Sequence, residues 1–261
     1  MRSGWIIDKV AKLPKAKDAI LIEGLPGIGN VGKVVVDFLV EEWDAKKLCS
    51  FSSHAMPHSV FVNEENLIEL PSIALYHKKI KDKDVFLLAG DVQPSDEESS
   101  YQFCEEVLNL CKDCNVKEIV TLGGIGLQNI PKNPKVYCTG NDKKVVSDYK
   151  KKTDVDDHLY GVVGPIIGVS GLLLGLAKKR NLPAGALLAE TFGHPMYLGV
   201  KGSKEILKVL EQRFELKIDI KELDKEIKEL ESEVKKRTGE LAKQGSLQKV
   251  SSQLGEQNYI G

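Results

Sequence analysis

A glycine-rich segment, Gly24–Lys33 with the sequence GLPGIGNVGK, carries residue types that hold phosphate in nucleotide-binding proteins. Gly27, Gly29 and Gly32 match the dinucleotide pattern G-x-G-x-x-G, and Gly27, Gly32 and Lys33 match the Walker A pattern up to its last position. An apolar run precedes the segment and an amphipathic run follows it, which predicts strand, turn and helix. The chemistry would be phosphate binding by backbone N–H groups where the helix starts.

Both nucleotide patterns lack a residue that their chemistry requires. A dinucleotide site needs a carboxylate about 20 residues further on to hold the ribose, and the next predicted strand ends in Cys49–His54 with none. A P-loop needs a hydroxyl after its lysine to bind Mg²⁺, but Val34 stands there. Asp91 is separated from the apolar run before it by Ala89–Gly90, so it fits a second nucleotide motif poorly. We therefore predict that the glycines serve tight turns and close packing.

We make the same structural prediction for a second glycine-rich turn, so the predicted structural glycines are Gly27, Gly29, Gly32, Gly123, Gly124 and Gly126.

Cys111 and Cys114 are spaced as C-x-x-C, but no second pair or short-spaced histidines accompany them, so buried apolar thiols are favoured over a metal site. The acidic cluster around His158 lacks the spacing of a calcium loop and indicates a solvated loop. The sequence predicts no catalytic residue, no metal site and no cofactor.

Composition limits the class of protein. The 261 residues contain 37 Lys+Arg and 38 Asp+Glu, so no basic excess indicates nucleic acid as a partner. The longest apolar stretch, Val162–Ala177, contains a proline and is shorter than the ~20 residues of a membrane span. An odd number of cysteines, five, does not suggest a secreted disulfide framework. We expect a cytoplasmic protein that is not held in a membrane.

Residues 19–200 alternate strand-like and helix-like segments, which predicts an α/β layered domain with a largely parallel sheet. Ser95 and Glu98 form a candidate capping box for a helix over Asp96–Cys114. The other predicted helices are Val31–Val40, Lys143–Lys150, Gly168–Lys179 and Ser203–Phe214. The predicted strands are Ala19–Glu23, Lys47–Phe51, Ser59–Val62, Ile73–Tyr76, Val85–Leu88, Ile119–Leu122 and Ala186–Glu190.

The C-terminal part differs in character from this domain, which we place at residues 1–215. Apolar residues recur at three- and four-residue steps between Ile220 and Leu241, which predicts a long amphipathic, coiled-coil-like helix over 216–243. That helix either packs on its own domain or mediates self-association or a contact with a partner. Residues 244–261 are rich in Gln, Ser and Gly and predict a flexible tail, yet the tail ends in Tyr259, Ile260 and Gly261.

Five segments, in order, give the chain a family resemblance. Taken together they resemble the proteasome assembly chaperone family, above all its archaeal members, over about residues 5–215. The segments are LPGIGNVG at Leu25–Gly32, GDVQP at Gly90–Pro94, TLGGIG at Thr121–Gly126, GPIIGVSGLLLG at Gly164–Gly175 and LLAETFG at Leu187–Gly193.

The resemblance implies a three-layer α/β/α domain similar to the phosphorylase/hydrolase-like fold, in a cytoplasmic homo-oligomer that needs no nucleotide. It also implies binding to the α-ring of the 20S proteasome, in assembly or in ATP-independent activation. In several family members a C-terminal hydrophobic–tyrosine–any-residue signature inserts between α-subunits, with its carboxylate and tyrosine as anchors. Here Tyr259 is third from the end and follows Asn258, so the tail departs from that signature.

Three hypotheses remain open at this point. The leading one is a non-enzymatic, oligomeric proteasome-binding chaperone whose tail, Tyr259–Gly261, contacts the α-ring. The alternative is a phosphorylase- or hydrolase-like enzyme that holds a nucleoside or phosphate at the turns Gly27–Gly32 and Gly123–Gly126. A weaker alternative is a coiled-coil scaffold with an inert α/β head.

Overall fold

The structure is a computed structural model, and it describes residues 4–161, 164–195 and 197–219. The chain divides into two compact units, Met1–Ile218 and Asp219–Gly261, and the description below concerns the first. The tail residues Tyr259, Ile260 and Gly261 and nearly all of the predicted helix over 216–243 lie outside the described residues. Leu216 and Ile218 are described; they are buried and not helical.

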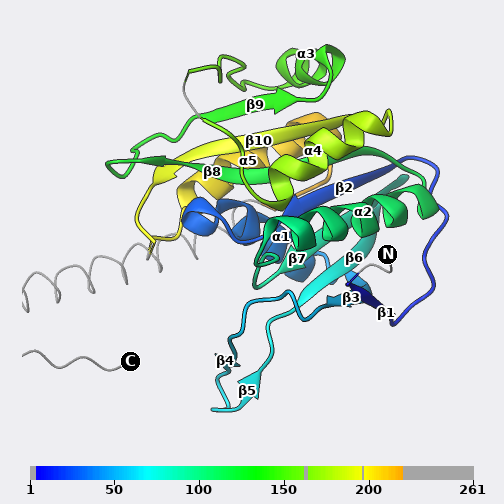
Figure 1. The fold of residues 1–261 in the computed structure, drawn as a ribbon. Coiled ribbons are helices and arrows are strands. Elements are labelled where there is room, and N and C mark those ends of the chain that lie inside the picture. The colour runs from blue at the N-terminus through cyan, green and yellow to red at the C-terminus, as the bar shows by residue number, and fades with distance from the viewer. Residues whose placement is uncertain (1–3, 162–163, 196, 220–261) are drawn as a thin grey trace, which may run out of the picture. The chain divides into compact units, whose positions relative to one another are not determined.

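One eight-stranded mixed sheet forms the centre of this unit (Figure 1). Its middle strands β7, β2, β8 and β10 are parallel, while β1, β3 and β6 on one side and β9 on the other are antiparallel to their neighbours. The largely parallel sheet predicted from sequence is therefore parallel only at its centre. In spatial order the strands are β1 (Ile6–Lys9), β3 (Lys46–Ser52), β6 (Ile73–Ile80), β7 (Lys83–Gly90), β2 (Ala19–Gly24), β8 (Val116–Leu127), β10 (Ala184–Phe192) and β9 (Val136–Gly140).

Helices cover both faces of the sheet, which confirms the predicted α/β class (Figure 1). On one face α1 (Val31–Glu42) packs beside α5 (Val200–Phe214), and on the other α2 (Glu97–Asp113) packs beside α4 (Val169–Lys179). A fifth helix, α3 (Lys143–Lys152), lies against β9 and α5. None of the helices in the described part of the chain is both long and apolar enough to cross a bilayer.

The central strands are buried on both faces, as their continuous apolar sequences predict. All six residues of β2 are buried, and so are the last six of β7. Alternate side chains such as Leu21, Phe86 and Ile119 pack in one apolar core with Phe103 of α2 and Leu173 of α4. Because a β-strand alternates its side chains, the remaining residues of these strands face α1 and α5.

Two local predictions need correction. The cap of α2 is Asp96 rather than Ser95: the Asp96 Oδ1 atom accepts a hydrogen bond from the Ser99 amide at 2.8 Å, and Ser99 replaces Glu98 in the capping box. The predicted strand Ser59–Val62 does not join the main sheet. Instead β4 (Phe61–Val62) and β5 (Ile68–Glu69) form a separate antiparallel hairpin between β3 and β6. Strand β9 has no counterpart in the sequence-based prediction.

Candidate functional site

The glycine-rich segment forms the corner between β2 and α1, as predicted. After Gly24 the chain makes one short 3₁₀ turn at Ile28–Asn30 and enters α1 at Val31. Gly29 (φ 61°) and Asn30 (φ 49°) are consecutive left-handed residues, a conformation that favours glycine and asparagine over other residues. They reverse the chain within two residues, so α1 starts directly against the sheet.

The two glycine-rich segments lie against one another at this corner. A Cβ atom on Gly124 would lie 2.2 Å from the Ile28 carbonyl oxygen, and one on Gly32 would lie 2.5 Å from the Leu122 carbonyl oxygen. Gly126 lies against Ile28 and Gly193, so the contact continues to the end of β8. The space between the segments is therefore filled by their own backbones, which argues against a shared anion-binding cradle there.

The remaining glycines of the set differ in their surroundings. A Cβ on Gly29 would lie 2.6 Å from the Thr191 hydroxyl oxygen of β10, and one on Gly123 would lie 3.0 Å from Leu188. Around Gly27 nothing lies within 4 Å of the corresponding position, and its backbone is extended with φ −159°. In this structure five of the six glycines make close approaches, whereas Gly27 does not.

Lys33, the Walker-like lysine, does not point toward the loop. Its Nζ atom lies 2.9 Å from the Asp37 carboxylate and 3.2 Å from the Asp91 carboxylate, and it donates to the Gly90 carbonyl oxygen at 3.1 Å. Burial alone would lower the pKa of Lys33, but the two carboxylates outweigh it and raise that pKa above its usual value. The lysine is thus a permanently charged tie between α1 and the end of β7.

Gln93 connects this corner to α4. Its Nε2 atom donates to the Pro26 carbonyl oxygen, and its Oε1 atom accepts a hydrogen bond from the Val169 amide at 3.0 Å. The amide belongs to the first residue of α4, which follows Gly168 in a left-handed conformation (φ 84°). Thr191 and Gly124 contact the glycine-rich turn, and Gln93 joins that turn to α4. All five sequence segments behind the family resemblance therefore meet at the carboxyl ends of the central parallel strands. In open α/β sheets this is where ligands bind.

A buried carboxyl group at this corner was missed by the sequence-based reasoning. Glu23, the penultimate residue of β2, is fully buried, and its Oε1 atom accepts a hydrogen bond from the Leu25 amide at 3.1 Å. Its Oε2 atom and the hydroxyl of its register partner Thr121 have no hydrogen-bond partner among the described residues. Burial raises the pKa of Glu23 to about 7, against the opposing effect of the hydrogen bond from the Leu25 amide. A carboxylate ending the apolar sequence AILIE is the signal that could have revealed it.

The other candidate chemical groups are not assembled into a site. All five cysteines are free and buried, as predicted for Cys111 and Cys114, and burial raises the pKa of Cys114 to about 11. His77 bonds to Asp84 on β7 at 2.8 Å, far along the sheet from the glycine corner. In the loop cluster Asp156–His158, which was predicted to be solvated, His158 is exposed and both aspartates are half-buried, and Asp157 pairs with Lys150 at 2.8 Å.

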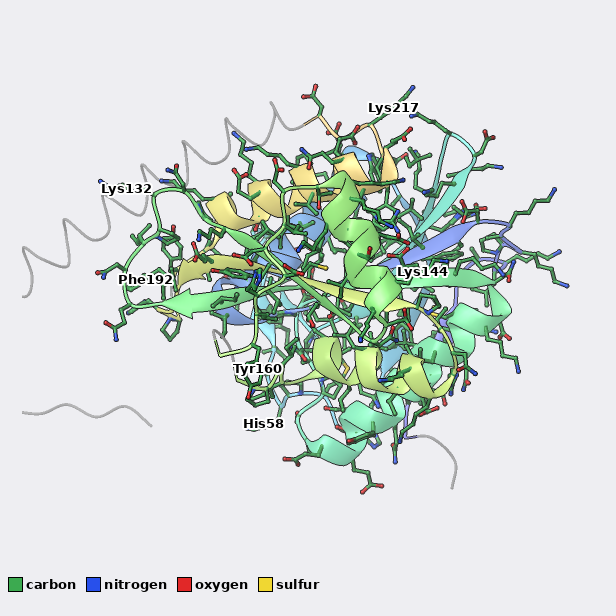
Figure 2. All side chains as sticks on the ribbon, turned by 90° about the horizontal axis from the view of Figure 1, so that it is seen from above. His58, Lys132, Lys144, Tyr160, Phe192 and Lys217 are labelled. Carbon is green, nitrogen blue, oxygen red and sulfur yellow. The ribbon has the colours of Figure 1, made fainter. Side chains whose placement is uncertain are left out.

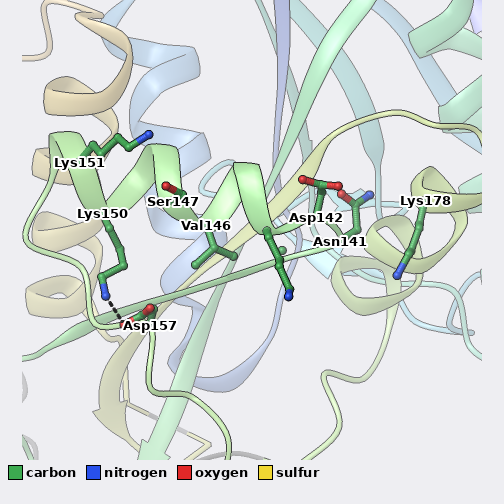
Figure 3. Close-up of a pocket in the computed structure, with 10 residues that line it drawn as sticks. Asn141, Asp142, Val146, Ser147, Lys150, Lys151, Asp157 and Lys178 are labelled. Carbon is green, nitrogen blue, oxygen red and sulfur yellow. Dashed lines mark ion pairs between the residues drawn. The ribbon is translucent and has the colours of Figure 1, made fainter.

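A surface groove of about 740 Å³ runs along α3 (Figure 3). It is lined by Lys143, Lys150, Lys151 and Lys178, with Asp142 and Asp157 among them. Lys150 is engaged by Asp157, as the dashed line in Figure 3 marks. The Asn141 side chain on its floor is held by the Leu174 and Leu182 carbonyl oxygens and the Ala184 amide, so it serves the fold. We assign no site to this groove.

The fold and the corner together define an α/β domain whose glycine-rich turn is packed on itself and lacks the groups of a nucleotide site. The chain belongs to the PAC2 family, whose profile matches residues 21–238.

One sequence relative and two solved structures are similar to this chain over most of its length. A protein of uncharacterised function from Methanocaldococcus jannaschii is 28% identical over 221 residues, 84% of this chain and 83% of the relative. The crystal structure of Pyrococcus furiosus PbaB, described as an archaeal proteasome activator, matches with a TM-score of 0.80 and 30% identity, over 90% of this chain and 99% of PbaB. Pyrococcus furiosus PbaA, described as an archaeal homologue of proteasome-assembly chaperone, shares the fold with a TM-score of 0.73 and 22% identity, over 96% of this chain and 99% of PbaA.

The close backbone contacts predict which glycines tolerate a side chain. Gly32→Ala and Gly124→Ala should each lower the free energy of unfolding by about 1–3 kcal/mol, because a methyl group would overlap a carbonyl oxygen of the facing segment. Gly27→Ala is the matched control, since its Cβ would meet open space in an extended backbone. Urea denaturation of the three variants measures the difference. Equal stability of all three would contradict the packing described for this corner.

Glu23 predicts a pH-dependent stability. The pKa of Glu23 is about 7 in the folded protein, against 4.5 for a glutamate in water. The folded state therefore holds the proton more tightly than the unfolded state. Stability should therefore fall as pH rises from about 4.5 to 7 and then level off.

Glu23→Gln removes this titration while keeping an oxygen for the Leu25 amide. The variant should exceed the wild type in free energy of unfolding by roughly 1–3 kcal/mol at pH 8, with the difference shrinking toward pH 5. Chemical denaturation across that range measures it, with the exposed Glu64→Gln as control. A difference that does not change with pH would show that Glu23 does not titrate in this range.

Proposed function

We propose that this protein is a proteasome assembly chaperone or ATP-independent 20S proteasome-binding factor that acts on the α-ring as a homo-oligomer. The observation that carries the proposal is the similarity to PbaB, at 30% identity and a TM-score of 0.80 across 90% of this chain. The likeness to PbaA supports the same fold at lower identity. The cytoplasmic location and the finer phosphorylase/hydrolase-like classification expected from the sequence are part of this proposal.

The geometry of the glycine corner argues against an enzyme that binds a nucleotide or phosphate there. Lys33 is tied to Asp37 and Asp91, Val34 supplies no hydroxyl for Mg²⁺, and Gly124 meets the Ile28 carbonyl instead of a phosphate. The alternative of a nucleoside- or phosphate-binding enzyme at these turns is therefore the weaker one. Titration calorimetry with phosphate, nucleosides and ATP tests it directly, and clear binding by the isolated protein would favour the enzyme.

Association with 20S particles is the direct test of the proposal. Immobilised protein should retain both α-subunit rings and assembled 20S proteasomes from an archaeal source, equally well with and without ATP. Comparing peptide hydrolysis by 20S particles before and after addition separates an activator from an assembly factor. The absence of any association with free α-subunits and assembled particles would overturn the proposed function.

The tail residues Tyr259, Ile260 and Gly261 are the proposed contact with the α-ring. Deleting them should weaken binding to the α-ring about tenfold or more, as expected when an aromatic anchor is lost. Surface plasmon resonance on immobilised 20S particles measures the change. Ser252→Ala, in the same tail, is the control and should bind like the wild type. Unchanged affinity after the deletion would show that the domain, not the tail, makes the contact.

A further inference from the structure

The β4–β5 hairpin is an exposed apolar element that nothing in the described part of the chain covers. Its six large apolar side chains are between 45% and 79% exposed: Val60, Phe61, Val62, Leu67, Ile68 and Leu70. Figure 1 shows the hairpin projecting away from the main sheet. Isolated exposed apolar residues are ordinary on a protein surface, but a contiguous group of this kind marks an interaction site.

The hairpin is a built structure rather than an irregular loop. The Asn63 Oδ1 atom accepts hydrogen bonds from the Glu65 and Leu67 amides, and its Nδ2 atom donates to Glu69 at 2.7 Å. The strands pair through Phe61 with Glu69 and Val62 with Ile68, and the Asn63 amide donates to the Leu67 carbonyl oxygen at 2.9 Å. A two-stranded hairpin is marginally stable alone in water and gains stability from a further strand or packing surface. Its geometry is thus preformed for a partner that buries it.

The charge of the hairpin narrows the choice of partner. Between Ser59 and Pro71 the chain carries three glutamates, Glu64, Glu65 and Glu69, and neither lysine nor arginine. Burying this element leaves its carboxylates at the rim of the contact, where like charges repel and opposite charges select the partner. The surface that receives it should therefore combine apolar side chains with lysine or arginine.

This chain presents such a surface on the β8–β9 loop, residues 128–135 with the sequence QNIPKNPK. The loop exposes Ile130, Lys132 and Lys135 and contains no acidic residue. Its base is fixed, because the Lys135 amide donates to Glu190 at 3.0 Å and the Gly193 amide donates to the Leu127 carbonyl at 2.9 Å. Figure 2 shows Lys132 at the outer edge of the domain.

The hairpin and the 128–135 loop of a single chain cannot contact one another. The hairpin joins β3 to β6 and the loop joins β8 to β9, and β7 and β2 lie between β6 and β8 in the sheet. The two elements lie far apart in Figure 1, and the hairpin points away from the sheet. A contact between them therefore requires at least two copies of the chain.

We propose that the protein self-associates head to tail, with the β4–β5 hairpin of one copy packed on the 128–135 loop of the next. Such a contact is heterologous, so it generates a ring where the rotation between copies closes. The inference rests on the homo-oligomer in the proposed function and names the surfaces that form it. It does not depend on binding to the proteasome.

Charge exchange tests the contact in the full-length protein. Glu64→Lys with Glu65→Lys, and separately Lys132→Glu with Lys135→Glu, should each weaken self-association at least about tenfold, because each places like charges across the contact. A chain with all four substitutions should regain the wild-type oligomer, since its reversed hairpin meets a reversed loop. Ile68→Ser should weaken association through lost apolar burial.

Sedimentation velocity over a range of concentrations reads out these variants, and thermal unfolding monitored by circular dichroism shows that each still folds. The control is Lys151→Glu with Lys152→Glu, the same charge change on α3, which should leave the oligomer intact.

Three results would overturn the head-to-tail contact: an unaltered oligomer in the hairpin variants, failure of the fourfold variant to reassemble, or a wild-type monomer at every concentration. In the first of these cases, a loss of binding to 20S particles would assign the hairpin to the proteasome instead. A wild-type monomer that still binds 20S particles would leave the proposed proteasome role standing.

Discussion

The close approach of backbones at the glycine corner is the constraint on which the rest of the domain depends. A Cβ on Gly24 would lie 2.1 Å from the Gly32 carbonyl oxygen, and one on Gly32 would lie 2.5 Å from that of Leu122. The first turn of α1 can therefore lie directly on β2 and β8, with no side chain between the backbones at the glycine contacts. Its buried face, including Val35 and Leu39, then reaches the sheet, and α5 packs beside it. Without this contact distance the helical layer on that face would have to shift.

Polar side chains connect the glycine corner to β7 and to α4. Lys33 fixes α1 to the end of β7, and Gln93 joins the loop to the first amide of α4 on the opposite face. A sequence that looks like a phosphate loop thus uses its lysine inside the protein, since the two carboxylates around it satisfy the ammonium group. The geometry shared with nucleotide-binding folds is the strand–turn–helix corner, and the chemistry is different.

The sequence predicts those parts of the fold that depend on local patterns. Continuous apolar runs located β2, β7 and β8, and helical periodicity located α2 and α4 within a residue or two. The glycine corner could be placed because its turn residues are local. Contacts between segments that are distant in the sequence could not be predicted. Nothing in GDVQP shows that Gln93 forms hydrogen bonds with Pro26 and Val169. In the sequence, Glu23 looks like the end of an ordinary strand. The strand at Phe61–Val62 was predicted, but its pairing with Ile68–Glu69 was not, because a short apolar run has the same pattern whether it joins a large sheet or stands apart.

The position of β2 in the sheet has a consequence for synthesis of the chain. Ile20 pairs in register with Val85 of β7 and Glu118 of β8, so both neighbours of this fully buried strand are made long after it. At ribosomal rates of about 5–20 residues per second, its apolar edges wait for roughly 5–20 s before the second neighbour emerges. During that interval Ala19–Gly24 lacks at least one of the two strands that pair with it in the folded domain. The strand at the centre of the sheet is thus made well before the strands that enclose it.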